Sequence, residues 1–516
     1  MKFQYLLAAF FAAVVYAAPS NGGNNGEIVG NHDENDSSSS GECKPLLQSC
    51  NDNSDCCSDN CLAGFCLVGY NVKTMGSERL PLRQIGIYHN LPDFDSSLKG
   101  LTVIITGANG ISGFHTMRAL LAAPERWSKI YALSRRPPPE QMMGLLTPEQ
   151  RSKVQHVACD FLESGDKIAQ ALKEANVTAD YIFFYSYLQP KPPPGGAIWS
   201  NADELVKVNS ALLSNFLDSL PQAGIKPTRF LLQTGAKNYG VHIGRIRTPS
   251  CESDPQPKDL QPNFYYPQEE LLFKYCKDNG VGWNIIMPAW IIGATNNAQM
   301  NALHPFSVYA AVQAHKGEPL TFGGDWNAWQ GLSFHSAARL TGFLSEWAVL
   351  EDKCKDQRFN AIDDSPFSWD RFFHELTRWF SVEKGVIPPP EDDSKYQEMT
   401  GRAGKETPLG YGPPTKIRAS FTLSSWAKEE VNQKAWKELM SQSGGKLTHD
   451  PFEDIEANFS CGDAAWTTVM LCVNKARILG WTGFVDTMEA VFEMYSEMEQ
   501  LGMVPAMKVD KPKPHV

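Results

Sequence analysis

The sequence predicts an α/β fold built on a doubly wound parallel sheet. The segment Leu101 to Ile105 is short, apolar and rich in β-branched side chains, as in a strand that is buried on both faces. Gly107, Gly110 and Gly113 follow this strand, and an apolar-periodic run after them predicts a helix. From residue 101 to residue 294, strand-like and helix-like segments alternate, as they do in repeated β–α units.

The glycine-rich turn is a candidate phosphate-binding site. A strand that turns sharply into a helix leaves backbone N–H groups unpaired at the positive end of the helix dipole, where a pyrophosphate can bind. Glycines let the chain turn, admit the ligand to the backbone and allow the helix to pack closely. Glycine-rich turns are common, but the position between strand and helix favours a Rossmann-like dinucleotide site over an ordinary turn.

A second predicted strand, Lys129 to Leu133, ends in Ser134, Arg135 and Arg136. An acidic residue at this point would bind the ribose hydroxyls of NAD, whereas arginines suit the extra phosphate of NADP. Two solvated surface arginines are the alternative interpretation. The pattern favours NADPH as the cofactor.

Three further strands are predicted along the chain. Val154 to Ala158 ends at Cys159, Asp160 and Phe161, and an acid at this point in a Rossmann-like fold typically meets the adenine amino group. Helical runs are expected from Lys167 to Asn176 and through Asn209. The other two strands are Tyr181 to Ser186, which should end beside the nicotinamide, and Phe230 to Gln233.

Composition excludes some classes of protein. With 516 residues, of which 42% are hydrophobic, the chain can bury one large core and carry appendages. A net charge of −11 argues against nucleic acid as a partner. Beyond the N-terminus, no apolar run of the sequence is long enough to span a bilayer.

The N-terminus predicts entry into the secretory pathway, and hence a secreted protein. Residues 1–17 have the pattern of a signal peptide, with Lys2, an apolar core from Leu6 to Val15 and a small-residue cleavage site. For a membrane anchor, the rival interpretation, the apolar run is too short. Residues 18–42 are mostly Gly, Asn, Asp, Glu and Ser and are expected to be a disordered linker.

Six cysteines between residues 43 and 66 resemble the knottin, or inhibitor cystine knot, pattern. Spacing alone leaves many pairings open. The resemblance implies the disulfides Cys43–Cys57, Cys50–Cys61 and Cys56–Cys66. A zinc site is the disfavoured alternative, because this segment has no C-x2-C pair and no histidine. The target of such a module is not indicated.

The other six cysteines are scattered, and their pairing is left open. Cys159 is expected to be a buried free thiol at a strand end. Asn35, Asn176 and Asn458 begin N-x-S/T triplets, which are weak signals for glycosylation.

Strand Phe230 to Gln233 leads into the residues Thr234 to Tyr239, and Asn263-Phe264-Tyr265-Tyr266 comes later. An ordinary short-chain dehydrogenase carries Tyr-x-x-x-Lys on one helix. Here Glu269 and Glu270 stand four residues after Tyr265 and Tyr266, so that motif is absent at this position.

These stretches resemble the progesterone 5β-reductase and iridoid synthase-like enone reductases, atypical members of the short-chain dehydrogenase/reductase superfamily. The matching segments are Gly107 to Gly113, Ser134 to Pro137, Gln233 to Tyr239, Asn263 to Tyr266, Met300-Asn301, Val308 to Ala311 and Lys475 to Phe484. The resemblance covers roughly residues 95–505. It implies an NADP-binding Rossmann-like domain at 95–300 and a mainly helical substrate-binding part at 301–506. The tail at 507–516, with three lysines and two prolines after Met507, is expected to be disordered from its own composition.

The implied reaction is NADPH-dependent reduction of a carbon–carbon double bond conjugated to a carbonyl, on a small hydrophobic substrate. In the resembling family, the catalytic tyrosine and lysine correspond to Tyr265 and Lys237. Tyr265 would stabilise the enolate oxygen, and Lys237 would raise the positive potential and orient the tyrosine. Without the resemblance, a core tyrosine and a solvated lysine would be the preferred interpretation.

The predicted cofactor site comprises Gly107, Asn109, Gly110, Ile111, Gly113, Ser134, Arg135, Arg136, Asp160, Phe161, Thr234, Tyr265 and Ile291. No metal site is predicted. The sequence departs from the family pattern at Met287 to Ala289, Trp290, Ala298 and Gln299, and Trp290 is expected to narrow the space at the nicotinamide.

Two functions compete at this point. One is the reductase, and the other is a secreted, non-catalytic binding protein that retains the fold. A sugar-nucleotide epimerase is a weaker third choice, since it would need Tyr-x-x-x-Lys. The sequence leaves the oligomeric state open, a homodimer included.

Overall fold

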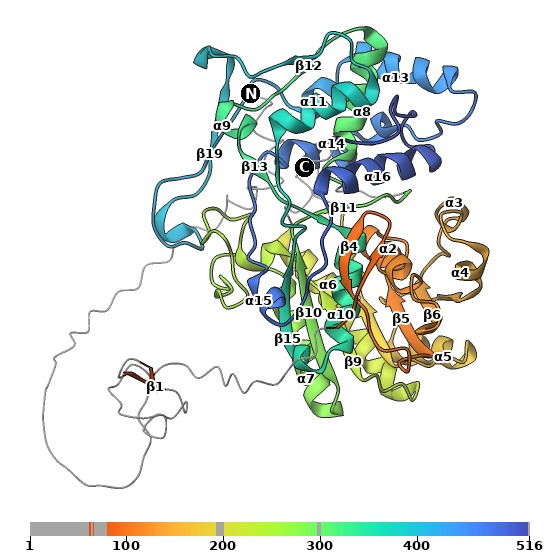
Figure 1. Ribbon diagram of the computed structural model, residues 1–516. Coiled ribbons are helices and arrows are strands. Elements are labelled where there is room, and N and C mark those ends of the chain that lie inside the picture. Colours follow the sequence, from red (N-terminus) through yellow and green to blue (C-terminus); the bar gives the residue numbers. More distant parts are fainter. Residues whose placement is uncertain (1–60, 63–64, 67–79, 192–200, 297–300, 514–516) are drawn as a thin grey trace, which may run out of the picture. The chain divides into compact units, whose positions relative to one another are not determined.

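The computed structural model describes residues 61–62, 65–66, 80–191, 201–296 and 301–513 (Figure 1). The predicted signal peptide and linker, the three predicted disulfides, Asn35, Ala298 and Gln299 lie outside the part that it describes. Within the predicted knottin-like module, β1 (Cys61–Leu62) pairs with β2 (Phe65–Cys66) in antiparallel fashion.

A seven-stranded sheet forms the centre of the nucleotide-binding part, and all of its neighbouring strands pair in parallel. In spatial order it consists of β7 (Val154–Ala158), β6 (Trp127–Ser134), β5 (Leu101–Thr106), β8 (Tyr181–Phe184), β9 (Arg229–Gln233), β10 (Gly282–Pro288) and β15 (Gln357–Ala361). The strand order reverses between β5 and β8, which creates a crevice at the carboxyl ends of these strands. The predicted doubly wound sheet is confirmed.

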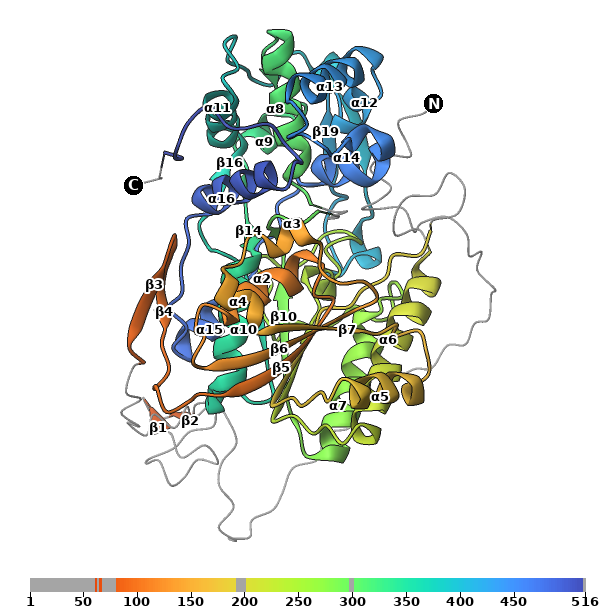
Figure 2. The same cartoon turned by 90° about the vertical axis from the view of Figure 1, so that its right-hand side faces the viewer.

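Helices cover both faces of this sheet (Figure 2). On one face, α6 (Ala202–Gln222) lies between α5 (Gly165–Glu174) and α7 (Tyr265–Asn279). On the other face, α2 (Ile111–Leu120) packs against α10 (Ala338–Leu350). The two helices approach closely at Gly342, where a Cβ atom would lie 2.9 Å from the Cα of Thr116. The sheet is therefore buried on both sides, as its apolar strands require.

The boundary predicted at residue 300 is wrong in one respect. Helix α10 and strand β15 come from residues 338–361, yet they complete the Rossmann-type part. The sequence Gln357 to Ala361 is too polar to indicate a strand by its pattern. It forms one because the edge of β10 offers a parallel partner over its full length.

The remaining C-terminal part is mainly helical, as predicted. Its helices are α8 (His304–Lys316), α9 (Trp326–Trp329), α11 (Trp369–Phe380), α12 (Leu423–Ala427), α13 (Glu430–Gln442), α14 (Ile455–Ala464), α15 (Asn474–Ile478) and α16 (Thr487–Gln500). The aromatic-rich segment Trp369 to Phe380 is helix α11. Its aromatic residues lie on one buried face, and the Ser368 hydroxyl accepts a hydrogen bond from the N–H of Arg371.

Short elements connect these parts. The strand pairs are β3 (Leu82–Ile85) with β4 (Tyr88–Pro92), β11 (Trp290–Ile292) with β14 (His335–Ala337), β12 (Leu320–Thr321) with β17 (Val386–Ile387), β13 (Leu332–Ser333) with β16 (Phe367–Ser368), and β18 (Gln397–Thr400) with β19 (Lys416–Ala419). The short helices are α3 (Glu140–Met143), α4 (Pro148–Ser152), η3 (Ala236–Tyr239), η4 (Asp352–Cys354), η5 (Asp393–Lys395), η6 (Gly404–Glu406) and η7 (Pro451–Asp454). None of the helices in the described ranges combines the length and apolar character that a membrane span requires.

The C-terminal tail differs from its prediction as a disordered segment. The N–H of Lys508 donates to the carbonyl of Trp379 at 2.6 Å, and the N–H of Lys513 donates to Glu375 Oε2 at 3.0 Å. The chain therefore follows helix α11 through Lys513, because a helix carbonyl and a helix carboxylate accept hydrogen bonds from its backbone N–H groups.

The expected free thiol and two of the N-x-S/T triplets lie in the part of the chain that the structure describes. Cys159 is a buried free thiol, as expected, and burial raises its pKa to about 11. Asn458 lies in helix α14, where its side-chain amide donates to the carbonyls of Pro451 and Asp454, both at 3.0 Å. A glycan would replace one of the two hydrogens on this nitrogen and so remove at least one of these hydrogen bonds, whereas Asn176 is exposed.

Candidate functional site

A cavity of about 680 Å³ lies at the carboxyl ends of β5, β8 and β9, in the crevice that the strand order creates. Its walls come from the glycine turn, the segment after β8, the segment Gln233 to Lys237, the start of α7, the segment Pro288 to Ile291 and helix α14. It brings together the predicted residues Gly107, Gly110, Ile111, Gly113, Arg135, Thr234, Lys237, Tyr265 and Ile291.

The glycine turn has the shape that a phosphate site needs. Gly107 has φ +63°, and a Cβ atom there would lie 2.8 Å from the carbonyl oxygen of Tyr185. A Cβ atom at Gly113 would lie only 2.4 Å from the carbonyl oxygen of Gly107. Helix α2 begins after Gly110, and no described side chain caps it. Its first backbone N–H groups can therefore bind an anion.

The predicted 2′-phosphate residues lie on one turn after β6. The carbonyl of Arg136 accepts hydrogen bonds from Asn109 Nδ2 at 2.8 Å and from the Ser134 hydroxyl at 2.7 Å. Asn109 and Ser134 thus fix the turn, while the side chains of Arg135 and Arg136 are exposed. Arg135 also lines the cavity, so the turn presents positive charge at its rim.

The two predicted adenine-side residues differ from one another. The Asp160 carboxylate accepts a hydrogen bond from the N–H of Leu162 at 3.0 Å and is partly exposed. Phe161, in contrast, is a core residue: its ring lies 5.1 Å from that of Phe216 and 6.2 Å from that of Phe184, centroid to centroid. The predicted contact of Phe161 with the cofactor would therefore come from its backbone, because its ring is packed in the core.

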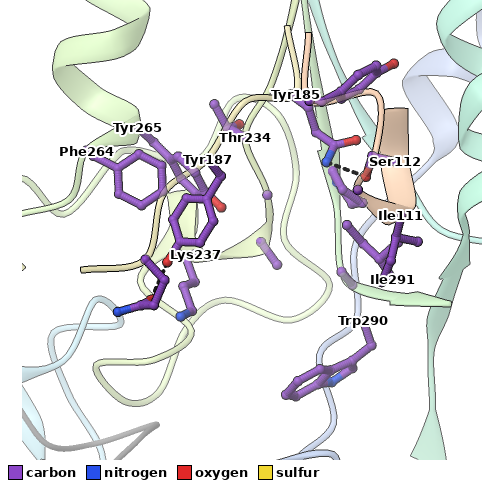
Figure 3. A pocket seen from close by; sticks show the side chains of 18 of the residues that line it. Ile111, Ser112, Tyr185, Tyr187, Thr234, Lys237, Phe264, Tyr265, Trp290 and Ile291 are labelled. Atoms are coloured by element: carbon purple, nitrogen blue, oxygen red, sulfur yellow. Dashed lines mark hydrogen bonds between the residues drawn. The ribbon is translucent and has the colours of Figure 1, made fainter. Parts of the chain in front are cut away.

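Lys237 and Tyr265 both face the cavity (Figure 3). Burial lowers the pKa of Lys237 to about 7, against a smaller opposing effect of the Cys461 thiol. Burial raises the pKa of Tyr265 above its ordinary value, so its hydroxyl keeps its proton at neutral pH. The cavity thus holds a hydrogen-bond donor beside an amine whose charge changes near neutral pH.

Asn263 holds the backbones of these two residues together. Its Nδ2 donates to the carbonyl of Lys237 at 2.9 Å, and its Oδ1 accepts from the N–H of Tyr265 at 3.0 Å. Tyr265 is the first residue of α7, so this contact also fixes the start of that helix.

Two buried polar atoms in the cavity wall point to a ligand. Thr234 Oγ1 and Gln233 Oε1 are buried and have no hydrogen-bond partner within the part of the chain that the structure describes. Gln233 Nε2 donates to the Ser112 hydroxyl at 2.8 Å, which leaves the amide oxygen as an acceptor. Buried polar atoms normally have partners. A carboxamide or ribose hydroxyl of a nicotinamide nucleotide has the complementary groups, so these residues fit such a cofactor.

Several cavity residues were missed by the sequence analysis. Tyr187 packs against Phe264 with ring centroids 5.6 Å apart, and its hydroxyl donates to Gln189 (Figure 3). Its place after the end of β8 could have indicated it, because ligands bind at the carboxyl ends of parallel strands. Cys461 comes from helix α14, and no local sequence signal marks it.

Trp290 lines the cavity, as expected.

The fold and the cavity define a dinucleotide-binding α/β protein of the Rossmann type, with a lysine and a tyrosine in the same cavity as the phosphate turn. A family model described as "PRISE-like Rossmann-fold domain" matches residues 103–400, and the chain belongs to this family. The family resemblance predicted from the sequence is thereby confirmed. A reductase of this family uses a nicotinamide cofactor.

Curated relatives match over most of their length. An uncharacterized protein of Schizosaccharomyces pombe is 28% identical over 79% of this chain and 99% of its own. A short chain dehydrogenase, gsfE, of Penicillium aethiopicum is 26% identical over 78% of this chain and 99% of its own. An (S)-8-oxocitronellyl enol synthase of Nepeta cataria is 25% identical over 78% of this chain and 92% of its own. The chain is thus related to oxidoreductases of the short-chain dehydrogenase type.

Proposed function

We propose that this protein is an NADPH-dependent reductase that reduces the carbon–carbon double bond of an α,β-unsaturated carbonyl compound. The observation that carries the proposal is the placement of Tyr265 and Lys237 in the same cavity as the glycine turn. The names of the relatives support it, since several are enol synthases and an enol is the first product of hydride addition to an enone.

The chemistry divides between the cofactor and the chain. When bound, NADPH supplies a hydride to the β-carbon of the substrate. The Tyr265 hydroxyl, kept protonated by burial, donates a hydrogen bond to the carbonyl oxygen as negative charge develops on it. Lys237, when protonated, adds positive potential to the cavity and favours the same charge. Apolar walls such as Phe264 and Trp290 suit a small hydrophobic substrate.

Preference for NADPH over NADH rests on the turn after β6. Arg135 and Arg136 are both exposed, so their guanidinium groups are accessible to a ligand. Asn109 and Ser134 hold the backbone of this turn in place. The turn can therefore receive a 2′-phosphate through charge-assisted hydrogen bonds, with little reorganisation.

A fluorescence titration of the purified protein with NADPH and with NADH tests this proposal. We expect NADPH to bind at least tenfold more tightly, and turnover of NADPH to appear with members of a panel of small enones and enals. Failure to bind either nucleotide would contradict the proposal and favour the alternative, a secreted binding protein that retains the fold without catalysis.

A further inference from the structure

Two cysteines that are far apart in the sequence lie next to one another outside the cavity. Cys251 follows η3, and Cys472 follows helix α14. The two segments are joined by a parallel bridge between Ser250 and Leu471. The N–H of Ser250 donates to the carbonyl of Met470 at 3.0 Å, and the N–H of Cys472 donates to the carbonyl of Ser250 at 2.8 Å.

One residue further along each segment, Cys251 lies opposite Cys472, because the two segments run in parallel. Paired residues of neighbouring strands lie about 5 Å apart, and their side chains leave the backbone on the same side. A disulfide requires Cα atoms roughly 4.4–6.8 Å apart, so the register places both sulfurs within bonding reach without moving the backbone. The Cys472 thiol also contributes to the raised pKa of Cys251, as expected for two neighbouring side chains.

A third element holds the pair in register. Asn360 of β15 donates from Nδ2 to the carbonyls of Ser250 and Cys472, both at 3.0 Å. The Asn360 side chain is itself fixed, because its Oδ1 accepts from the Tyr239 hydroxyl at 2.7 Å. Asn360 is fully buried, so the two segments are held by a side chain that cannot move away easily.

Both cysteines are half-buried free thiols, so a small reagent can reach them. Burial, followed by the hydrogen bond with Cys472, raises the pKa of Cys251 to about 11. At neutral pH Cys251 is therefore mainly a thiol rather than a thiolate.

We propose that Cys251 and Cys472 form a redox-sensitive dithiol that closes to an intrachain disulfide. The oxidant is a small disulfide of the glutathione class. The Cys472 thiolate attacks one sulfur of that disulfide, its S–S bond breaks, and one thiolate leaves. Cys251 then loses its proton to solvent and attacks the sulfur of Cys472, and the second thiol leaves. Two protein thiols are oxidised to one disulfide, and the small disulfide is reduced to two thiols.

The cross-link joins two segments that adjoin the cavity. The chain between Lys237 and Cys251 is short, and Val469 of the second segment lines the cavity wall. A disulfide between residues so distant in sequence restricts the unfolded chain strongly. It therefore stabilises the fold and holds one wall of the cavity against the sheet.

The test equilibrates the full-length protein with oxidised glutathione, blocks remaining thiols with N-ethylmaleimide under denaturing conditions, and maps peptides without reductant. We expect one linked pair of peptides that contains Cys251 and Cys472 and disappears on reduction. Recovery of both cysteines as alkylated thiols, or of either linked to a different cysteine, would overturn the proposal.

Variants separate this disulfide from any other in the chain. We expect oxidised wild type to melt a few degrees above reduced wild type. Cys251→Ser should abolish the linked peptide and reduce this difference, whereas the control Cys461→Ser should keep the linked peptide. An unchanged difference between the oxidised and reduced melting temperatures in Cys251→Ser would count against the stabilising role.

Discussion

The side-chain amide of Asn263 donates a hydrogen bond of 2.9 Å to the carbonyl of Lys237. Through its Oδ1, which accepts from the N–H of Tyr265, the same side chain sets the start of helix α7. Asn263 therefore positions the two residues to which we assign the chemistry, although it need not touch the substrate.

We expect Asn263→Ala to lower kcat about 10- to 100-fold, because both backbones lose their common anchor. The Kd for NADPH should change little, since the glycine turn is intact. Asn279→Ala is the matched control: Asn279 ends the same helix, where its Nδ2 donates to the carbonyl of Tyr275 at 2.9 Å. Equal losses of kcat in both variants would contradict a specific positioning role.

Tyr265→Phe removes the proposed hydrogen-bond donor to the enolate oxygen. We expect kcat/KM for enone reduction to fall about 10²- to 10³-fold, as on removal of one oxyanion-stabilising donor. Tyr266→Phe is the control. The Tyr266 hydroxyl donates to the carbonyl of Asn238 at 3.2 Å, and Tyr266 is not among the residues that line the cavity. Steady-state kinetics of both variants compare them directly, and a Tyr265→Phe enzyme with wild-type kcat/KM would exclude the proposed role.

The buried Lys237 makes stability depend on pH. Because burial lowers its pKa from 10.5 to about 7, the unfolded chain binds more protons between these values, and stability rises with pH through this window. Below about pH 7 the cost of the buried charge is fully present. At about pH 6, the free energy of unfolding of Lys237→Met should therefore exceed that of wild type by on the order of a few kcal/mol. This difference in free energy, the stability gap, should shrink towards about pH 9.5.

Chemical denaturation at both pH values measures this gap. Lys274→Met is the control, because Lys274 is an exposed residue of α7 paired with Asp278. Its pH dependence should follow wild type. A Lys237→Met variant whose gap to wild type is the same at both pH values would show that Lys237 is not buried as described.

The sequence predicted those parts of the molecule that depend on local physics. The strands β5 to β9 and the glycine turn follow from apolar runs and from glycines at a strand–helix junction, and the structure confirms them. Lys237 and Tyr265 came from a family resemblance rather than from their residue types. Both do face the same cavity.

Long-range contacts could not be predicted in this way. Strand β15 carries Gln357, Arg358 and Asn360 and becomes a strand only because β10 offers its edge. Cys461 reaches the cavity from a helix that lies more than two hundred residues beyond Lys237 in the chain. The Phe161 ring lies in the core because Phe184 and Phe216 pack around it.

From the geometry of the glycine turn, we expect Gly113→Ala and Gly110→Ala to differ clearly in their free energy of unfolding. Gly113→Ala should lower the free energy of unfolding by at least about 2 kcal/mol, because its Cβ atom would lie 2.4 Å from the backbone oxygen of Gly107. Gly110→Ala should change stability by less than about 1 kcal/mol, since Gly110 has φ −84° and the nearest atom to its Cβ would be 3.4 Å away. Thermal denaturation of both variants checks the contrast, and equal stability would contradict it.

Arg135→Ala should weaken NADPH binding about 10- to 100-fold and leave NADH binding nearly unchanged, because only NADPH carries the 2′-phosphate. Arg151→Ala is the control, since this arginine of α4 is paired with Glu140 away from the cavity. Fluorescence titration of wild type and of both variants with NADPH and with NADH measures the six dissociation constants. Equal weakening of both nucleotides would show that Arg135 binds a part that they share.

The most direct test follows the hydride itself. NADPH deuterated at C4 of the nicotinamide is incubated with the protein and an enone that it turns over, and the product is examined by NMR. The account predicts deuterium at the β-carbon of a saturated carbonyl product. Deuterium at the carbonyl carbon would contradict it, because the protein would then reduce the carbonyl and not the conjugated double bond.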